Sequence, residues 1–180
     1  ICNHMLLQTS VPEALVEDDV HEHFFADETD LDPYQAVAIG PGLGQDEATA
    51  QALFAQIKSC YIPLVVDADA LNLLARYTAN LANLPRHTIL TPHVKELERI
   101  IGRCSNSYER LMKAKSMAVN LQCFIILKGA WTAIISPEGT ISFNPTGNPG
   151  MATGGSGDVL TGILLALLAP GYTAEDACRL

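Results

Sequence analysis

The chain has 180 residues, of which 48% are hydrophobic and 17% charged, and its formal net charge at pH 7 is −9. This composition predicts a single domain over residues 1–180 with a sizeable core, and it excludes disordered and fibrous proteins. The acidic balance and the absence of a Lys or Arg run argue against nucleic acid or an anionic membrane as a partner, although glycine-rich backbone can still bind small anions.

Five cysteines form no Cys-x-x-Cys pair, which favours reduced thiols and a cytoplasmic location over a disulfide framework or a zinc site. The longest apolar run, residues 159–169, is interrupted by Thr161 and Gly162 and is too short to cross a bilayer. The first residue is not Met, so a removed targeting segment stays an open alternative.

Residues 1–32 carry the weakest pattern in the chain. His21 and His23 flank Glu22 and would share one side of a strand, and His4 adds a third imidazole that suggests a metal site. The segment is rich in Asp and Glu and has no third ligand at a typical spacing, so we favour the interpretation that it binds no metal.

The first clear unit is an apolar strand at residues 36–39, followed by Gly40-Pro-Gly-Leu-Gly44 and a helix that starts near Asp46. Ligands of open α/β sheets bind beyond the carboxyl ends of the strands, where this loop would lie. Gly42 and Gly44 therefore either contact a substrate or serve only the tight turn.

A second strand, residues 64–67, ends in an acidic residue, and Asp69 follows two positions later. Paired carboxylates at that edge can hold hydrated magnesium or bind a ribose hydroxyl. Asp69 can equally cap the short helix that runs through Leu73. We expect one of Asp67 and Asp69 to serve a site, and the sequence does not decide which.

A third strand, residues 88–90, leads through Pro92 into a helix over residues 97–101. His93 and Glu96 are three positions apart, so both face the cleft if the helix begins at His93. The alternative is a solvated helix start without a function, made of Lys95, Glu96 and Glu98.

The next pattern is an amphipathic surface helix over residues 107–121, with Ser107 as its expected cap. A fully apolar strand follows at residues 123–127. Lys128 comes directly after this strand and can neutralise a nucleotide phosphate.

A β-hairpin is predicted next, from two β-rich runs at residues 132–135 and 140–143. Trp131 precedes it and is better explained by packing than by stacking on adenine. The repeated strands and helices predict an α/β fold, in which helices cover both faces of a mainly parallel sheet and the hairpin finishes one side.

The richest glycine stretch covers residues 144–162 and enters an apolar segment of helix length that ends near Leu168. A helix N-terminus after such a loop favours phosphate, so we expect an anion cradle at Gly155, Ser156 and Gly157. A carboxylate beside it would repel phosphate, so Asp158 is expected to take a proton from a hydroxyl that attacks phosphorus. The alternative is an Asp that only favours the helix dipole, after a loop that binds nothing.

The stretch Asn148-Pro-Gly-Met-Ala-Thr-Gly-Gly-Ser-Gly-Asp158 resembles the signature of the ADP/ATP-dependent NAD(P)H-hydrate dehydratases, a branch of the ribokinase-like superfamily. Three further segments agree with this branch in type and order: Gly40-Pro-Gly-Leu-Gly44, Val66-Asp-Ala-Asp-Ala-Leu-Asn72 and Leu127-Lys-Gly-Ala-Trp-Thr132. The resemblance extends over nearly the whole chain from about Ala36, and it implies a ribokinase-like fold with the hairpin near the nucleotide site.

This resemblance implies a hydro-lyase that acts on hydrated NADH or NADPH, with ADP or ATP as phosphoryl donor and Mg²⁺ between its phosphates. Phosphorylation of the hydroxyl and elimination would restore the dihydronicotinamide. In that scheme Asp158 accepts the hydroxyl proton, and the N–H groups of Gly155, Ser156 and Gly157 stabilise the moving phosphoryl oxygens. The resemblance also implies a homo-oligomer and an associated NAD(P)H-hydrate epimerase domain.

Two groups of binding residues follow from the same resemblance. The nucleotide is implied to contact Lys128, Gly129, Ala130, Trp131, Thr132, Asn148, Gly150, Met151, Ala152, Thr153, Gly154 and Gly157. The substrate is implied to contact Gly42, Gly44, Asp69, Asn72, His93, Glu96, Arg99 and Asp158, and Glu96 would also hold Mg²⁺ through water. Ribokinase-like enzymes usually have Asn where His93 stands, and close relatives often have Pro-Gly in place of Val94-Lys95, so this segment departs from the pattern.

Members of the family begin with a further strand and continue past the helix that starts at Ala174, so we expect truncation at both ends. Two other functions fit the residues. A small-molecule alcohol kinase, such as a hydroxyethylthiazole kinase, would leave phosphate on its product. A non-catalytic nucleotide-binding fragment would be unaffected by Asp158→Asn. The sequence does not distinguish ADP from ATP, or NADH hydrate from NADPH hydrate.

Overall fold

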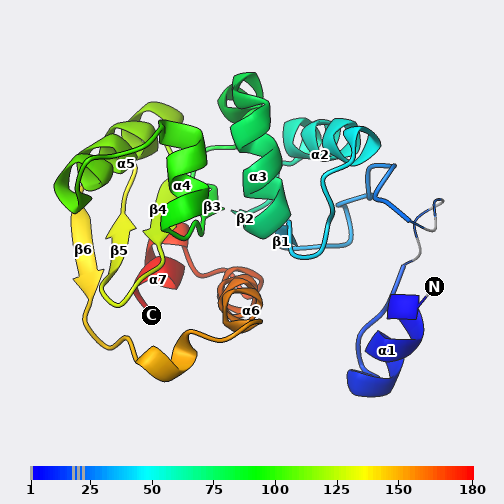
Figure 1. The fold of residues 1–180 in the computed structure, drawn as a ribbon. Coiled ribbons are helices and arrows are strands. Elements are labelled where there is room, and N and C mark those ends of the chain that lie inside the picture. The colour runs from blue at the N-terminus through cyan, green and yellow to red at the C-terminus, as the bar shows by residue number, and fades with distance from the viewer. Residues whose placement is uncertain (1, 18, 20, 22) are drawn as a thin grey trace.

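A six-stranded sheet forms the centre of the computed structural model, which describes residues 2–17, 19, 21 and 23–180 (Figure 1). Its strands follow one another in chain order: β1 (Val37–Ile39), β2 (Leu64–Val66), β3 (Ile89–Leu90), β4 (Phe124–Leu127), β5 (Thr132–Ile135) and β6 (Ile141–Asn144). Strands β1 to β4 are parallel, whereas β5 and β6 form the antiparallel hairpin. The predicted mainly parallel sheet with a terminal hairpin is confirmed.

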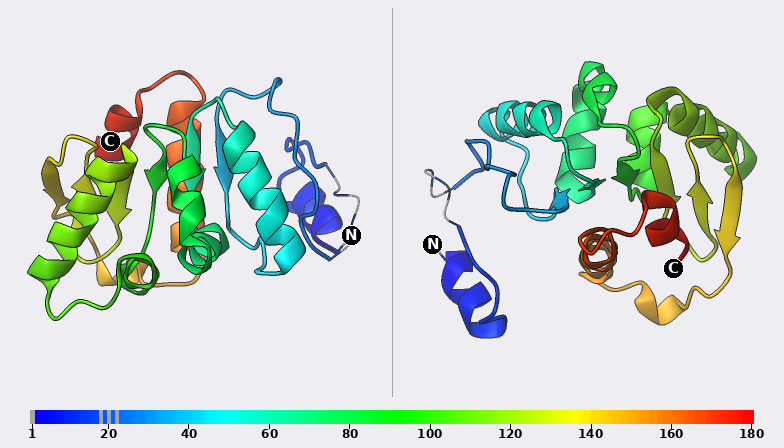
Figure 2. Two further views of the ribbon diagram at one scale, coloured as in Figure 1. Left: turned by 90° about the horizontal axis from the view of Figure 1, so that it is seen from above. Right: turned by 180° about the vertical axis from the view of Figure 1, so that it is seen from behind.

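Helices cover both faces of this sheet, as the two further views show (Figure 2). One face carries α2 (Glu47–Ser59), α3 (Ala68–Arg76), α4 (Val94–Ile101) and α5 (Ser107–Leu121). The other face carries α6 (Ser156–Leu168) and α7 (Ala174–Arg179). The remaining helices are α1 (Cys2–Ser10) and the 3₁₀ turns η1 (Thr78–Asn83) and η2 (Pro149–Met151). Within the described residues, no helix is both long and apolar enough to cross a membrane.

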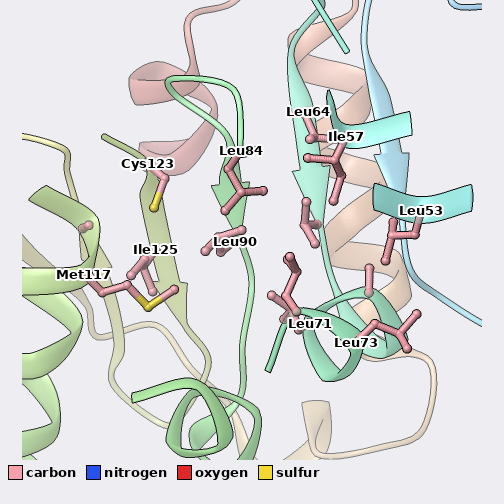
Figure 3. Close-up of a cluster of buried hydrophobic side chains, with 14 of the residues drawn as sticks. Leu53, Ile57, Leu64, Leu71, Leu73, Leu84, Leu90, Met117, Cys123 and Ile125 are labelled. Carbon is pink, nitrogen blue, oxygen red and sulfur yellow. The ribbon is translucent and has the colours of Figure 1, made fainter. Parts of the chain in front are cut away.

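The alternation of side chains along β2 shows how the sheet separates two cores. Leu64 and Val66 pack with the layer of α2 to α5, while Val65 between them packs with α6 and α7. Figure 3 shows the larger core, where Leu71 of α3 and Leu90 of β3 lie among other buried apolar side chains. Strands buried on both faces hold their carboxyl ends in fixed positions, which suits them to carry a site.

Two helix starts differ from expectation. Helix α4 begins at Val94 rather than at residue 97, because His93 and Glu96 close a capping box around its first turn. Ser107 is not the cap of α5 but its first residue. The side chain of Asn106 accepts a hydrogen bond from the amide of Glu109 at 2.8 Å, because Asn106 has the extended backbone that a cap requires.

The N-terminal segment contains a helix, α1, which the sequence does not predict. His21 and His23 lie in bends rather than in a strand, and the ring of His21 stacks on Phe24. Glu22 lies outside the described residues. The described part of the chain shows no group of three His, Cys, Asp or Glu side chains arranged to hold a metal.

Candidate functional site

The N-terminus of α6 has the geometry of an anion-binding cradle. Gly155 precedes the helix with a φ of 88°, a left-handed conformation that glycine adopts without steric cost. No side chain caps the helix, and among the described residues the N–H groups of Gly157 and Asp158 meet no acceptor. These amides at the positive end of the helix dipole are free to bind an anion.

The carboxylate of Asp158 lies beside this cradle and faces solvent. Its side chain is exposed, and within the described residues it forms no hydrogen bond or ion pair. The hydroxyl of Ser156, unlike the carboxylate of Asp158, already has a partner, because its Oγ donates to the carbonyl oxygen of Thr153 at 3.0 Å. The carboxylate next to the cradle is therefore available to a ligand, as the predicted role of a base requires.

A partly buried ion pair lies directly behind the cradle. The ammonium of Lys128 donates to Oδ1 of Asp67 at 2.8 Å, and the hydroxyl of Thr161 donates to Oδ2 at 2.9 Å. Asp67 is only 1% exposed. A Cβ at Gly157 would lie 3.3 Å from Nζ of Lys128 and 3.7 Å from Oδ2 of Asp67. The pair thus packs against the backbone of the first turn of α6.

Asp69 has a different task from Asp67. Its Oδ2 accepts the amide of Gly44 at 3.1 Å, and its Oδ1 accepts the side-chain amide of Gln45 at 2.8 Å. Asn72 donates to the same Oδ1 at 3.4 Å and accepts a hydrogen bond from Arg99. The alternative in which Asp69 caps α3 is wrong, because its carboxylate binds the glycine loop. Gln45 belongs to this network but had no signal in the sequence.

The structure brings together four of the predicted substrate residues in this network: Gly44, Asp69, Asn72 and Arg99. Gly42 and Gly44 have φ values of 67° and 81°, so the left-handed turn by itself explains glycine at both positions. Their contact with a substrate stays a prediction.

His93 and Glu96 form the capping box of α4. Nδ1 of His93 accepts the amides of Lys95 and Glu96 at 3.1 and 3.2 Å, and Oε2 of Glu96 accepts the amide of His93 at 2.8 Å. The imidazole Nε2 also lies 3.4 Å from Oε1 of Glu96. Glu96 is only 7% exposed and Glu98 pairs with Arg110, so the alternative of a merely solvated helix start is wrong for both glutamates and holds only for the exposed Lys95.

The loop at residues 144–148 touches residues 128–132, which are predicted to contact a nucleotide. A Cβ at Gly147 would lie 2.5 Å from the carbonyl oxygen of Ala130, so only glycine permits this close approach between residues 144–148 and 128–132. Trp131 lies at this junction and is 68% exposed. Its interpretation as a packing residue is wrong, because the turn between β4 and β5 projects the indole into solvent.

The loop that enters α6 carries the other predicted nucleotide residues. Oδ1 of Asn148 accepts the amide of Gly150 at 2.8 Å and thereby starts η2. The predicted nucleotide residues of this loop are all exposed: Asn148, Gly150, Met151, Ala152, Thr153 and Gly154. Thr132 is held by a hydrogen bond from its hydroxyl to the carbonyl oxygen of Gly129 at 3.0 Å.

Four parallel strands followed by a β-hairpin, with helices on both faces of the sheet, form the architecture of a ribokinase-like fold. The chain is similar to a ribokinase-like superfamily protein from Enterococcus faecalis, with 29% identity and a TM-score of 0.67 over 81% of this chain and 52% of that chain. The fold class that the sequence predicts is thereby confirmed.

The sequence model of the NAD(P)H-hydrate dehydratases matches residues 1–179, and the chain belongs to this family. It is 46% identical over 146 residues to the bifunctional NAD(P)H-hydrate repair enzyme of Moorella thermoacetica, covering 80% of this chain and 28% of that protein. It is also similar to the ADP/ATP-dependent NAD(P)H-hydrate dehydratase of Bacillus subtilis, co-crystallised with ATP/Mg²⁺ and soaked with CoA. That structure shares 34% identity and a TM-score of 0.75 over 97% of this chain and 63% of its own.

Proposed function

We propose that the chain carries the ADP- or ATP-dependent dehydration of hydrated NADH or NADPH, a hydro-lyase reaction. The observation that supports it most is the uncapped start of α6 beside the free carboxylate of Asp158. Membership of the dehydratase family favours this reaction over an alcohol kinase or a binding fragment. The chain spans less than a third of the Moorella relative, so the activity of the whole protein is part of the proposal.

The reaction would proceed in two steps. The hydroxyl oxygen of the substrate attacks the terminal phosphorus of ADP or ATP, its proton passes to Asp158, and AMP or ADP leaves. The bond between the ring carbon and the phosphate oxygen then breaks and phosphate leaves with the bonding electrons, while a proton passes from the adjacent ring carbon to water, which restores the ring double bond. Phosphorylation is needed because hydroxide is a poor leaving group.

Amides at the start of α6 would stabilise the charge that develops on the phosphoryl oxygens. Those of Gly157 and Asp158 are fixed by the helix and meet no other acceptor among the described residues. Removal of one such preorganised donor typically costs about 2.7–4 kcal/mol of transition-state stabilisation. The cradle therefore supports both nucleotide binding and catalysis in this proposal.

Mg²⁺ would neutralise charge between the phosphates of the donor when it is bound. The protein offers few free carboxylates for it, because Asp67 is paired with Lys128 and Glu96 closes its capping box. A cation held mainly by phosphate oxygens and water fits this donor set, with Glu96 acting through water.

The predicted binding residues divide into two surfaces. We propose that the nucleotide lies along residues 128–132 and 148–154, with the exposed ring of Trp131 available to the base. The hydrated dinucleotide would lie along the network of Asp69 and Arg99, with His93 beside it.

We further propose a single domain that acts in the cytoplasm as part of a homo-oligomer. The two cores share one sheet, which supports the single domain. Buried, unpaired thiols at Cys60, Cys123 and Cys178 suit a reducing compartment. The name of the Moorella relative describes it as bifunctional, which supports the expectation of a second, epimerase activity in the same protein.

Absorbance of the dihydronicotinamide ring tests the reaction directly. The chain is mixed with hydrated NADH or NADPH, ADP or ATP and Mg²⁺, and a nucleotide-dependent rise is expected. Asp158→Asn should lower kcat/KM by about 10²–10⁴-fold, the usual contribution of a general base. Glu175→Gln is the matched control, because Glu175 is an exposed acid in the first turn of α7. Phosphate retained on the product would identify a kinase instead. An equal rate in Asp158→Asn would contradict the proposed role of Asp158 as the general base.

A further inference from the structure

Asp67 is a buried carboxylate that the proposed reaction does not use. Both of its oxygens are occupied, Oδ1 by the ammonium of Lys128 and Oδ2 by the hydroxyl of Thr161. Its side chain is 2% exposed, whereas that of Lys128 is 21% exposed. A ligand at the start of α6 can therefore reach the ammonium but not the carboxylate.

Stability alone does not account for this arrangement. A buried ion pair contributes little net stability, because removing two charges from water offsets their attraction, and apolar side chains of similar volume often serve as well. What a buried, hydrogen-bonded pair does provide is a fixed position for the charged group. Here the fixed group is the Lys128 ammonium, which has three donors and uses one of them on Asp67.

The position of that ammonium is set relative to the cradle. It lies 3.3 Å from where a Cβ of Gly157 would be, and Thr161, which anchors the carboxylate, lies one turn further along the same helix. The helix that supplies the free amides therefore also supplies the hydroxyl that orients Asp67. One rigid element thus fixes both the amides and, through Asp67, the ammonium.

We propose that Asp67 and Thr161 are positioning residues: they hold the Lys128 ammonium behind Gly157, where it completes the site for a nucleotide phosphoryl group. The inference rests on the proposed function for the identity of that phosphoryl group. Asp67 is then not a ligand of substrate or cation, and its effect on the nucleotide passes through Lys128.

Thr161→Val tests this role, because it removes the hydroxyl at nearly constant volume. We expect the Kd for ADP, measured by calorimetry, to rise about tenfold, because the Lys128 ammonium would no longer be held where it can donate a hydrogen bond to the nucleotide. Thr161→Ser keeps the hydroxyl and should restore affinity to within about twofold. Thr49→Val is the matched control, since Thr49 is a buried threonine whose Oγ1 has no partner among the described residues. Its affinity should be unchanged.

A double-mutant cycle separates positioning from general damage. Once Lys128→Met has removed the ammonium, Thr161→Val should weaken ADP binding by less than about twofold further, because the group it positions is gone. Thermal unfolding of each variant checks that it is folded. Should Thr161→Val not fold, Thr161→Ala takes its place with the same expected outcomes.

Three results would overturn the inference: an unchanged Kd in folded Thr161→Val, the same fold-loss with and without Lys128, or a wild-type chain that binds neither ADP nor ATP. Failure of the proposed function can be distinguished from failure of this positioning role. If ADP binds and the variants follow the expected pattern while hydrated NADH and NADPH are not dehydrated, only the dehydratase proposal falls. If dehydration proceeds with a normal Kd in Thr161→Val, only the positioning role falls.

Discussion

Gly157→Ala should separate the function of the cradle from the stability of the fold. The backbone of Gly157 is not left-handed, so alanine fits it without strain, and in a helix alanine is favoured over glycine by about 0.8–1.0 kcal/mol. The added Cβ would meet Nζ of Lys128 at 3.3 Å, so the ammonium must move by a few tenths of an ångström away from the new methyl group. These effects oppose each other, and we expect the free energy of unfolding to stay within about 1 kcal/mol of wild type.

Nucleotide binding should respond much more strongly to the same change. The new methyl group displaces the ammonium and stands beside the free amides, so the Kd for ADP is expected to rise about tenfold, or 1.4 kcal/mol. Denaturant unfolding and calorimetric titration measure the two quantities. Gly162→Ala is the control on the same helix, because its Cβ meets nothing within 4 Å. Unchanged ADP affinity in Gly157→Ala, or an affinity loss matched by a large loss of stability, would refute the reasoning.

Two further predictions concern ionisable groups away from the cradle. At pH 8 a thiol reagent should modify Cys104 before Cys123, because burial raises the pKa of Cys123 to about 12; mass spectrometry after partial labelling gives the order, and early labelling of Cys123 would contradict it. Hydrogen bonds from Ser105, then Lys113, lower the pKa of Glu109 to about 2, so its stabilising effect is fully present above pH 4.5 and is lost as the pH falls through 2. Glu109→Gln should abolish that part of the pH dependence of thermal unfolding, and an identical profile in the variant would be the contrary result.

Local sequence patterns were sufficient for most of the fold. Continuous apolar runs located β2 and β4, and glycine loops located the strand ends that carry the site. These features depend on neighbouring residues, which a single sequence displays. The sequence pattern predicts too late a start for α4 because histidine is an uncommon cap, and only the folded geometry shows its Nδ1 accepting two amides.

The site was harder to predict where it depends on distant partners. The sequence does not show which side chains bind Asp67, because its partners Lys128 and Thr161 lie 61 and 94 positions away along the chain. The sequence does not predict the exposure of Trp131, for a related reason. A large aromatic ring is usually buried, and only the shape of the turn between β4 and β5 places this one in solvent.

The strand order of the sheet has a consequence for how the molecule assembles. Every strand pairs with the strands next to it in the chain, so each pairing closes a connection much shorter than the loop of 94 residues that the Asp67–Thr161 hydrogen bond closes. The proposed phosphate site at the start of α6 is therefore expected to form last, after the sheet is in place. In refolding, recovery of ADP binding should lag behind recovery of secondary structure, and simultaneous recovery would show that α6 docks as early as the strands pair. If ADP binding does lag, ADP binding reports the completion of folding and not merely its onset.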